Sequence, residues 1–190
     1  MYETEKILND KEINTSGILQ TGTEDKKMNL PIKKKAKIQT ERLCLKPYSS
    51  EDAGRLAEFF KNNEISKTFM VPDFESEKQI EDTVHLEYGI YCDNVMIGFV
   101  NDCGIEEDTI EIGYVIHPDY KGHGYATEAV LAIVEELREM GFQKVMAGFF
   151  EENTASRRVM EKAGMQLNGL VEEEEYRGII HKCYYCEINF

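Results

Sequence analysis

Two glycines stand in a short turn over residues 121–126, with the sequence KGHGYA, between two segments of different periodicity. β-Branched and aromatic residues over 110–116 predict a strand, and apolar residues at helical spacing over 126–140 predict a helix that ends at Gly141. The first N–H groups of a helix lack partners and carry the positive end of the helix dipole. Glycines just before them let an anion approach the backbone, so this turn could bind a phosphate or a pyrophosphate. The glycines would equally suit a tight connection that binds nothing, and the turn alone does not decide between the two.

The elements around this turn predict one domain of the α+β class. Strands are expected over 42–48, 88–92, 95–100, 110–116, 144–150, 165–171 and 179–189, and helices over 49–61, 76–86, 126–140 and 153–163. Loops are expected over 104–108 and over the acidic residues 172–175. Hairpins alternate with a strand–helix–strand crossover, so the sheet should be mixed and mostly antiparallel.

The N-terminal residues 1–35 are polar and lack clear periodicity, which predicts an extension that is mobile or docked on a neighbour. The domain is expected to span residues 36–190, a length that suits one hydrophobic core.

The composition indicates a soluble, cytoplasmic protein. A net charge of −14 argues against nucleic acid, and it suits either a cationic substrate or simple solubility. No apolar run approaches the ~20 residues of a membrane span, so no membrane partner is expected. The five cysteines are scattered, as in intracellular proteins with reduced thiols. Cys183 and Cys186 are three apart in an expected strand and should point to opposite faces, so we predict packing roles and no metal site.

Several short segments, in this order, resemble the GCN5-related N-acetyltransferase (GNAT) family. They are the turn over 121–126, Asn153-Thr-Ala-Ser156 and the sequence EKAGM over 161–165. The family's loop pattern is [Q/R]-x-x-G-x-[G/A], from which this sequence departs by carrying Lys121 in the first slot. Residues 111–118 and 126–129 are similar to the branch that acetylates N-terminal amines of ribosomal proteins, the RimJ/RimL type. The resemblance covers residues 38–190 and implies the acyl-CoA N-acyltransferase fold with a splayed strand pair.

The resemblance implies acetyl-CoA as the acyl donor, with its pyrophosphate bound by N–H groups from His123 to Thr127. In the family, the strand before the loop splays from the next strand through a bulge, and the pantetheine arm pairs with the freed backbone. Residues 114–116 and 147–149 would line that cleft. The donor-binding residues implied here are Tyr114, Val115, Ile116, Lys121, Gly122, His123, Gly124, Tyr125, Ala126, Thr127, Asn153 and Ser156.

Acetyl transfer to an amine sets its own chemical demands. A primary amine must lose a proton before it attacks a thioester, and Glu111, an acid within an apolar strand, is the candidate base. The alternative is a solvent-facing strand glutamate. The carbonyl oxygen needs a fixed donor, here an N–H near Val115 or Ile116. The slot where many relatives place an acidic tyrosine holds Met160, so the resemblance points to Ser156 as the acid and Asn153 as an orienting residue; the alternative for both is helix capping.

The acceptor stays open at this point. It could be a small molecule or a peptide or protein N-terminus, and a polyamine or aminoglycoside would suit the acidic charge. Residues 67–74 could line its pocket, and residues 172–175 either bind a cation or form a solvated loop. Two other classes compete: a non-catalytic acyl-CoA sensor, and a dinucleotide-binding domain that fits less well because a β-meander precedes the loop and Thr127 replaces the third glycine. A monomer and a homodimer are both compatible with the sequence.

Overall fold

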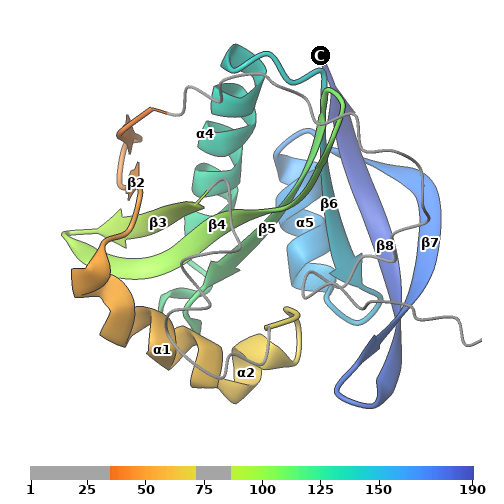
Figure 1. The fold of residues 1–190 in the computed structure, drawn as a ribbon, viewed down its shortest axis with the longest axis horizontal. Helices are drawn as coiled ribbons and strands as arrows, with labels where there is room; N and C mark the ends of the chain where they lie inside the picture. The colour runs from red at the N-terminus through yellow and green to blue at the C-terminus, as the bar shows by residue number, and fades with distance from the viewer. Residues whose placement is uncertain (1–34, 72–86) are drawn as a thin grey trace, which may run out of the picture.

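Eight strands form one sheet in the computed structural model, which describes residues 35–71 and 87–190 (Figure 1). They are β1 Ile38–Gln39, β2 Cys44–Lys46, β3 Glu87–Cys92, β4 Val95–Glu106, β5 Thr109–Ile116, β6 Lys144–Phe150, β7 Gln166–Tyr176 and β8 Ile179–Asn189. Their order across the sheet is β1-β2-β3-β4-β5-β6-β8-β7. Among the strands of the described residues only β5 and β6 run parallel, because the helix between them carries the chain back across the sheet. The predicted mixed, mostly antiparallel α+β fold is confirmed.

The helices of the described residues are α1 Ala53–Lys61, α2 Asn63–Ser66, α4 Tyr125–Glu139 and α5 Thr154–Lys162. The predicted start at Ser49 is confirmed: Ser49 and Asp52 form a capping box that opens a 3-10 turn leading into α1. Helix α2 was not predicted, and it begins where the Asn62 side chain accepts the N–H groups of Glu64 and Ile65. The helix expected over 76–86, together with Phe74 and residues 1–34, lies outside the described residues.

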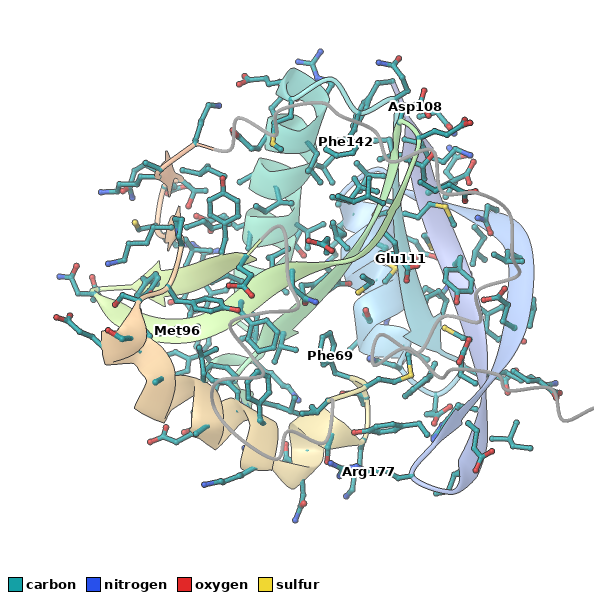
Figure 2. All side chains as sticks on the ribbon, viewed as in Figure 1. Phe69, Met96, Asp108, Glu111, Phe142 and Arg177 are labelled. Carbon is teal, nitrogen blue, oxygen red and sulfur yellow. The ribbon has the colours of Figure 1, made fainter. Side chains whose placement is uncertain are left out.

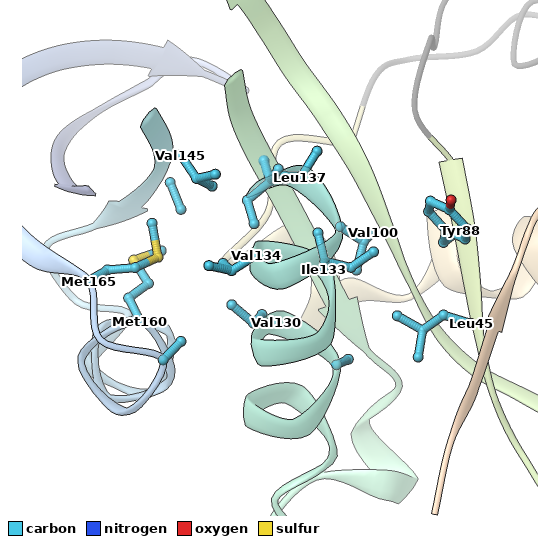
Figure 3. Close-up of a cluster of buried hydrophobic side chains, with 14 of the residues drawn as sticks. Leu45, Tyr88, Val100, Val130, Ile133, Val134, Leu137, Val145, Met160 and Met165 are labelled. Atoms are coloured by element: carbon cyan, nitrogen blue, oxygen red, sulfur yellow. The ribbon is translucent and has the colours of Figure 1, made fainter. Parts of the chain in front are cut away.

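The helices cover both faces of the sheet and divide the core in two. One cluster joins α4 and α5 to the strands, as Figure 3 shows for Val130, Ile133, Val134, Leu137, Val145, Met160 and Met165. The other joins α1 and α2 to β3, β4 and β5, through Leu56, Phe59, Ile65, Phe99 and Val115. Alternate residues of β5 therefore face different helices: Ile110 and Ile112 face α4, whereas Val115 faces α1.

Three predicted boundaries were wrong. The loop expected over 104–108 is strand up to Glu106, because the β4–β5 hairpin closes through a two-residue turn with Glu107 at φ 52°. The strand expected over 42–48 is limited to Cys44–Lys46, and β1 precedes it unpredicted because a two-residue strand leaves no periodic pattern. The acidic residues 172–175 belong to β7, where β8 supplies their backbone partners.

Lys35, the first described residue, packs against the domain through contacts with α4 and β3. The Lys35 N–H donates to Glu136 Oε1 at 3.0 Å, and Lys35 Nζ lies 2.7 Å from Glu136 Oε2. The Tyr88 hydroxyl donates to the Lys35 carbonyl at 2.8 Å. Glu136 is buried in α4, so its charge requires this partner. None of the helices in the described ranges is long and apolar enough to cross a membrane.

Candidate active site

Strands β5 and β6 separate after a short paired stretch. They pair only over Thr109–Glu111 and Lys144–Met146, although β5 continues to Ile116 and β6 to Phe150. Beyond Glu111 the two facing edges share no backbone pairing, which leaves N–H and C=O groups open to an extended ligand. The expected bulge occurs on the neighbouring strand: Cys103 of β4 is the extra residue, between Asp102 and Gly104.

The pairing of β5 with β4 determines which β5 amides point into this gap. The His117 N–H donates to the Ile97 carbonyl at 2.8 Å, and Val115 pairs with Phe99 two positions earlier. Hydrogen-bonded and non-bonded positions alternate along an antiparallel pair, so the Val115 N–H is directed to β4. The N–H groups of Tyr114 and Ile116 are directed into the gap. Of the two predicted oxyanion donors, the geometry therefore favours Ile116.

The glycine turn presents its backbone to solvent. Gly122 and Gly124 have φ of 84° and 81°, and residues 121–124 are exposed. The first backbone hydrogen bond of the helix runs from the Glu128 N–H to the Gly124 carbonyl at 3.1 Å. The N–H groups of residues 122–127 donate no backbone hydrogen bond to another described residue. A hollow of about 390 Å³ adjoins them, lined by Glu41, Arg42, Gly124, Thr127, Glu128, Leu131 and Lys162. Exposed N–H groups without partners at a helix start are a common binding site for anions.

Glu111 lies where the gap opens, at the last paired position of β5 (Figure 2). It is half-buried rather than fully solvent-facing, and a Cβ placed on Gly148 of β6 would lie 3.4 Å from its Oε1. Burial raises the pKa of Glu111 to about 7, with smaller contributions from the negative charges of Glu172 and Glu174. A carboxyl that titrates near neutral pH is suited to accept a proton from an ammonium group.

Two acids of β7 face Glu111 from across the sheet. Glu172 pairs with Cys183, whose Sγ lies 3.2 Å from a Cβ placed on Gly148, and Glu172 Oε2 accepts the Tyr185 hydroxyl at 2.7 Å. Residues alternate along a strand, so Glu174 shares this face. Burial, and then Glu172, raise the pKa of Glu174. Half of the acidic segment therefore contributes to the cleft.

Replacing Glu172 with Gln should lower the pKa of Glu111, because one of the negative charges that oppose its ionisation is lost. The expected shift is about half a pH unit, or about 0.7 kcal/mol, as for charges separated by several ångströms at partial burial. Gln retains an acceptor for Tyr185, so the packing should survive. The pH–rate midpoint should therefore move to lower pH, and the size of this acidic shift measures the change in the Glu111 pKa. Glu173→Gln, a change on the opposite face of the same strand, is the control and should leave the midpoint unchanged.

Tyr114 brings a hydroxyl to the start of α5. Its Oη lies 2.8 Å from Ser156 Oγ and donates to the Ser156 carbonyl at 3.0 Å. Burial raises the pKa of Tyr114, so the phenol is neutral and can donate. The Ser156 N–H donates to Asn153 Oδ1 at 3.1 Å, which makes Asn153 the N-cap, and Asn153 Nδ2 donates to the Thr68 carbonyl at 3.3 Å. Sequence reasoning placed Tyr114 in the cleft but did not pair it with Ser156, because their contact spans 42 residues.

The loop after α2 closes one side of the cleft. A Cβ on Gly113 would lie 2.9 Å from both a Phe69 ring carbon and Cys103 Sγ, so a larger residue would force these side chains to move. The Val71 N–H donates to the Tyr176 hydroxyl at 3.2 Å, which joins this loop to β7. Asn101 Oδ1 is buried near Gly113 and has no hydrogen-bond partner among the described residues. Asn101 was not predicted as a site residue, because a single polar residue in a strand carries no motif.

Lys121 and His123 both have exposed side chains. The His123 carbonyl accepts a hydrogen bond from Arg42 Nη1 at 2.9 Å. Cys183 and Cys186 are buried in β8, on opposite faces of the sheet, as predicted from their spacing.

Known proteins share this architecture. A family model for the acetyltransferase (GNAT) domain matches residues 42–166. The N-acetyltransferase YnaD of Bacillus subtilis is 43% identical over 68 residues, which are 35% of this chain and only 40% of that protein. The N-acetyltransferase YoaA of the same organism is 24% identical over 74% of this chain and 88% of its own length.

Solved structures agree over a longer stretch. A GNAT-family acetyltransferase from Bacillus anthracis has a TM-score of 0.71 and 26% identity, covering 80% of this chain and 98% of that chain. RimL, a ribosomal L7/L12 α-N-protein acetyltransferase solved with coenzyme A, has a TM-score of 0.70 and 17% identity, covering 85% and 97%. At that identity RimL supports the fold alone. The family match, the splayed strands and the exposed amide turn together assign the chain to the GNAT family of N-acetyltransferases.

Proposed function

We propose that this protein transfers an acetyl group from acetyl-CoA to a primary amine by direct attack of the amine on the thioester. One arrangement carries the proposal: the unpaired amides of residues 122–127 follow the open end of β5 through the short 3-10 turn Pro118–Tyr120, and Glu111 lies at the closed end of the β5–β6 gap. Acetyl-CoA supplies an acyl carbon that is activated by a thiolate leaving group. The residues of the chain must bind the donor, orient it and move protons.

The exposed amides and open strand edges of the donor site support coenzyme A as its ligand. The N–H groups from His123 to Thr127 would bind its pyrophosphate, because they are exposed and unpaired at a helix start. The open backbone edges of residues 114–116 and 147–149 would pair with the amides of the pantetheine arm. The Ile116 N–H, directed into the gap, is the candidate donor to the carbonyl oxygen. CoA and acetyl-CoA complexes of GNAT neighbours support this assignment.

Glu111 would remove a proton from the acceptor ammonium, directly or through one water. Its pKa of about 7 lies close enough to neutral pH for the carboxylate to be substantially present there. The half-buried position also limits competition from bulk water.

Two acceptor classes remain, each favoured by a separate observation. RimL, whose fold this chain shares, is a ribosomal L7/L12 α-N-protein acetyltransferase, which makes a peptide or protein N-terminus one acceptor class to test. The acids Glu172 and Glu174 beside Glu111 favour a small acceptor with several positive charges, such as a polyamine or an aminoglycoside.

Release of the CoA thiol with a panel of amines tests the proposed function. The panel should contain peptides with free N-termini, their N-blocked counterparts, a polyamine and an aminoglycoside. A rate that depends on a free amine supports the proposal, and the preferred class identifies the acceptor. Tight acetyl-CoA binding without turnover on any amine would contradict it and would favour the acyl-CoA sensor.

Replacing Ser156 with Ala should lower kcat about tenfold, the effect of losing one hydrogen bond of about 1 to 1.5 kcal/mol to the leaving thiolate. Tyr114 would return a proton to Ser156 through their 2.8 Å contact, so Tyr114→Phe should lower kcat as well. Thr154→Ala, an exposed change in the same turn of α5, is the control. If Ser156→Ala lowers the melting temperature but leaves kcat unchanged, its role is limited to the structure of the helix start.

A further inference from the structure

Arg42, in the connection between β1 and β2, joins that connection to the glycine turn. Its Nη1 donates to the His123 carbonyl at 2.9 Å, and its Nε donates to Glu128 Oε2 at 2.7 Å. The guanidinium also lies 4.8 Å from the centre of the Tyr125 ring. One side chain therefore contacts the turn, the first helical residue and the first-turn acid of α4.

Both carboxylate oxygens of Glu128 accept hydrogen bonds from residues of the β1–β2 connection. Its Oε1 accepts the Thr40 hydroxyl at 2.6 Å and the Arg42 N–H at 2.9 Å, and its Oε2 forms an ion pair with Arg42 Nη2 at 2.7 Å. The Glu128 side chain is only 17% exposed. Its contacts and the charge of Arg42 hold the pKa of Glu128 below its usual value, so it is ionised. Four charge-assisted contacts thus fix one carboxylate at the anion-binding end of α4.

The contact to the His123 carbonyl determines where the next amide points. In a trans peptide the C=O and the following N–H point in opposite directions. No cis peptide occurs in the described chain. Because Arg42 holds the His123 oxygen on its own side, the Gly124 N–H is directed away from Arg42, to the open side of the turn. The left-handed conformation of Gly124, with φ 81°, is thereby held from outside the turn.

Arg42 also neutralises the charge of Glu128, which affects how strongly an anion can bind at the start of α4. A carboxylate in the first turn favours the helix by itself but repels an anion bound at the same helix end. The positive charge of Arg42, whose Nη2 lies 2.7 Å from Glu128 Oε2, offsets this repulsion.

We propose that Arg42 is a positioning residue for the acyl donor, which orients the 123–124 peptide and neutralises Glu128 so that the turn can bind the diphosphate of coenzyme A. This inference rests on the proposed function only in that the turn binds coenzyme A. It assigns a role in donor binding to the β1–β2 connection, which carries no part of the glycine motif.

The dissociation constant of CoA, measured by calorimetry, tests the proposal without any turnover. Arg42→Gln should weaken CoA binding about tenfold. Arg42→Lys retains the charge but not the planar fork, so its affinity for CoA should lie between those of the unmodified protein and Arg42→Gln. Arg138→Gln, which removes an exposed arginine in the last turn of α4, at the opposite end from the glycine turn, is the control and should bind CoA like the unmodified protein.

A second mutation gives a test of sign. In Arg42→Gln the charge of Glu128 is left uncompensated. The double variant Arg42→Gln/Glu128→Gln should therefore bind CoA about threefold more tightly than Arg42→Gln alone. A purely structural role for the pair predicts instead that the double variant binds CoA no better than Arg42→Gln.

Truncated ligands separate this role from a direct contact with the nucleotide. The loss in Arg42→Gln should persist with dephospho-CoA, which lacks the 3′-phosphate, and should vanish with pantetheine, which lacks the diphosphate. A loss confined to ligands with the 3′-phosphate, or one that extends to pantetheine, would overturn the proposal. Failure to acetylate any amine would instead contradict the proposed function and leave these binding measurements valid.

Discussion

Replacement of Glu111 with Gln is expected to lower kcat by about 10²- to 10⁴-fold, the usual contribution of a general base, while CoA affinity stays within about twofold. Gln matches Glu in shape and can occupy the same half-buried position against Gly148, but it cannot accept a proton from an ammonium ion. Steady-state kinetics with a saturating amine measures kcat, and calorimetry measures CoA binding. Glu106→Gln, an exposed change on the neighbouring strand β4, is the matched control. A variant that retains full kcat would show that Glu111 is not the base.

The pH dependence provides an independent check on the same carboxyl. The base must be ionised, so the rate should rise with pH through a midpoint near the Glu111 pKa of about 7 and then level off. The folded-state pKa is raised above the unfolded value, so the native state binds more protons between about pH 4.5 and 7. The free energy of unfolding should therefore decrease as pH rises through that window. In Glu111→Gln this part of the decrease should disappear, which urea unfolding at several pH values can measure.

Local chemistry accounts for what could be predicted from the sequence. The turn at 121–126 and the strand and helix around it form a continuous segment, so their apolar spacing and glycines describe them without information from elsewhere. The Ser49 capping box and the end of α4 near Gly141 were predictable for the same reason. The parallel pairing of β5 with β6 followed from the crossover rule.

Contacts between distant residues account for what could not be predicted. The contact of Tyr114 with Ser156 and that of Arg42 with the turn each join segments that carry no shared pattern. The acidic residues 172–175 have the composition of a loop, and pairing with β8 outweighs that preference. Their alternation, which directs Glu172 and Glu174 to the cleft, became visible only once they were known to form a strand. The pKa of Glu111 depends on all of these placements together.

Gly122→Asp should weaken the binding of acetyl-CoA roughly threefold to hundredfold, because it places a carboxylate beside the amides proposed to bind the diphosphate. Unit charges about 6 Å apart repel by about 0.7 kcal/mol in water and by about 3 kcal/mol at the lower dielectric of a protein surface. The backbone should tolerate the change: a Cβ on Gly122 would meet nothing within 4 Å, and Asp and Asn adopt positive φ more readily than other residues. The KM for acetyl-CoA, measured at low ionic strength, should rise while kcat stays nearly constant.

Gly122→Asn is the matched control, because it has the same size and the same backbone strain at φ 84° but no charge. The difference between the two variants isolates the electrostatic effect, and it should shrink in high salt as the charges are screened. Equal KM values for the Asp and Asn variants at low salt would mean that no anion binds at this turn. A pH midpoint for kcat that stays the same in both variants would show, in addition, that the turn acts on the donor and that Glu111 acts separately on the acceptor.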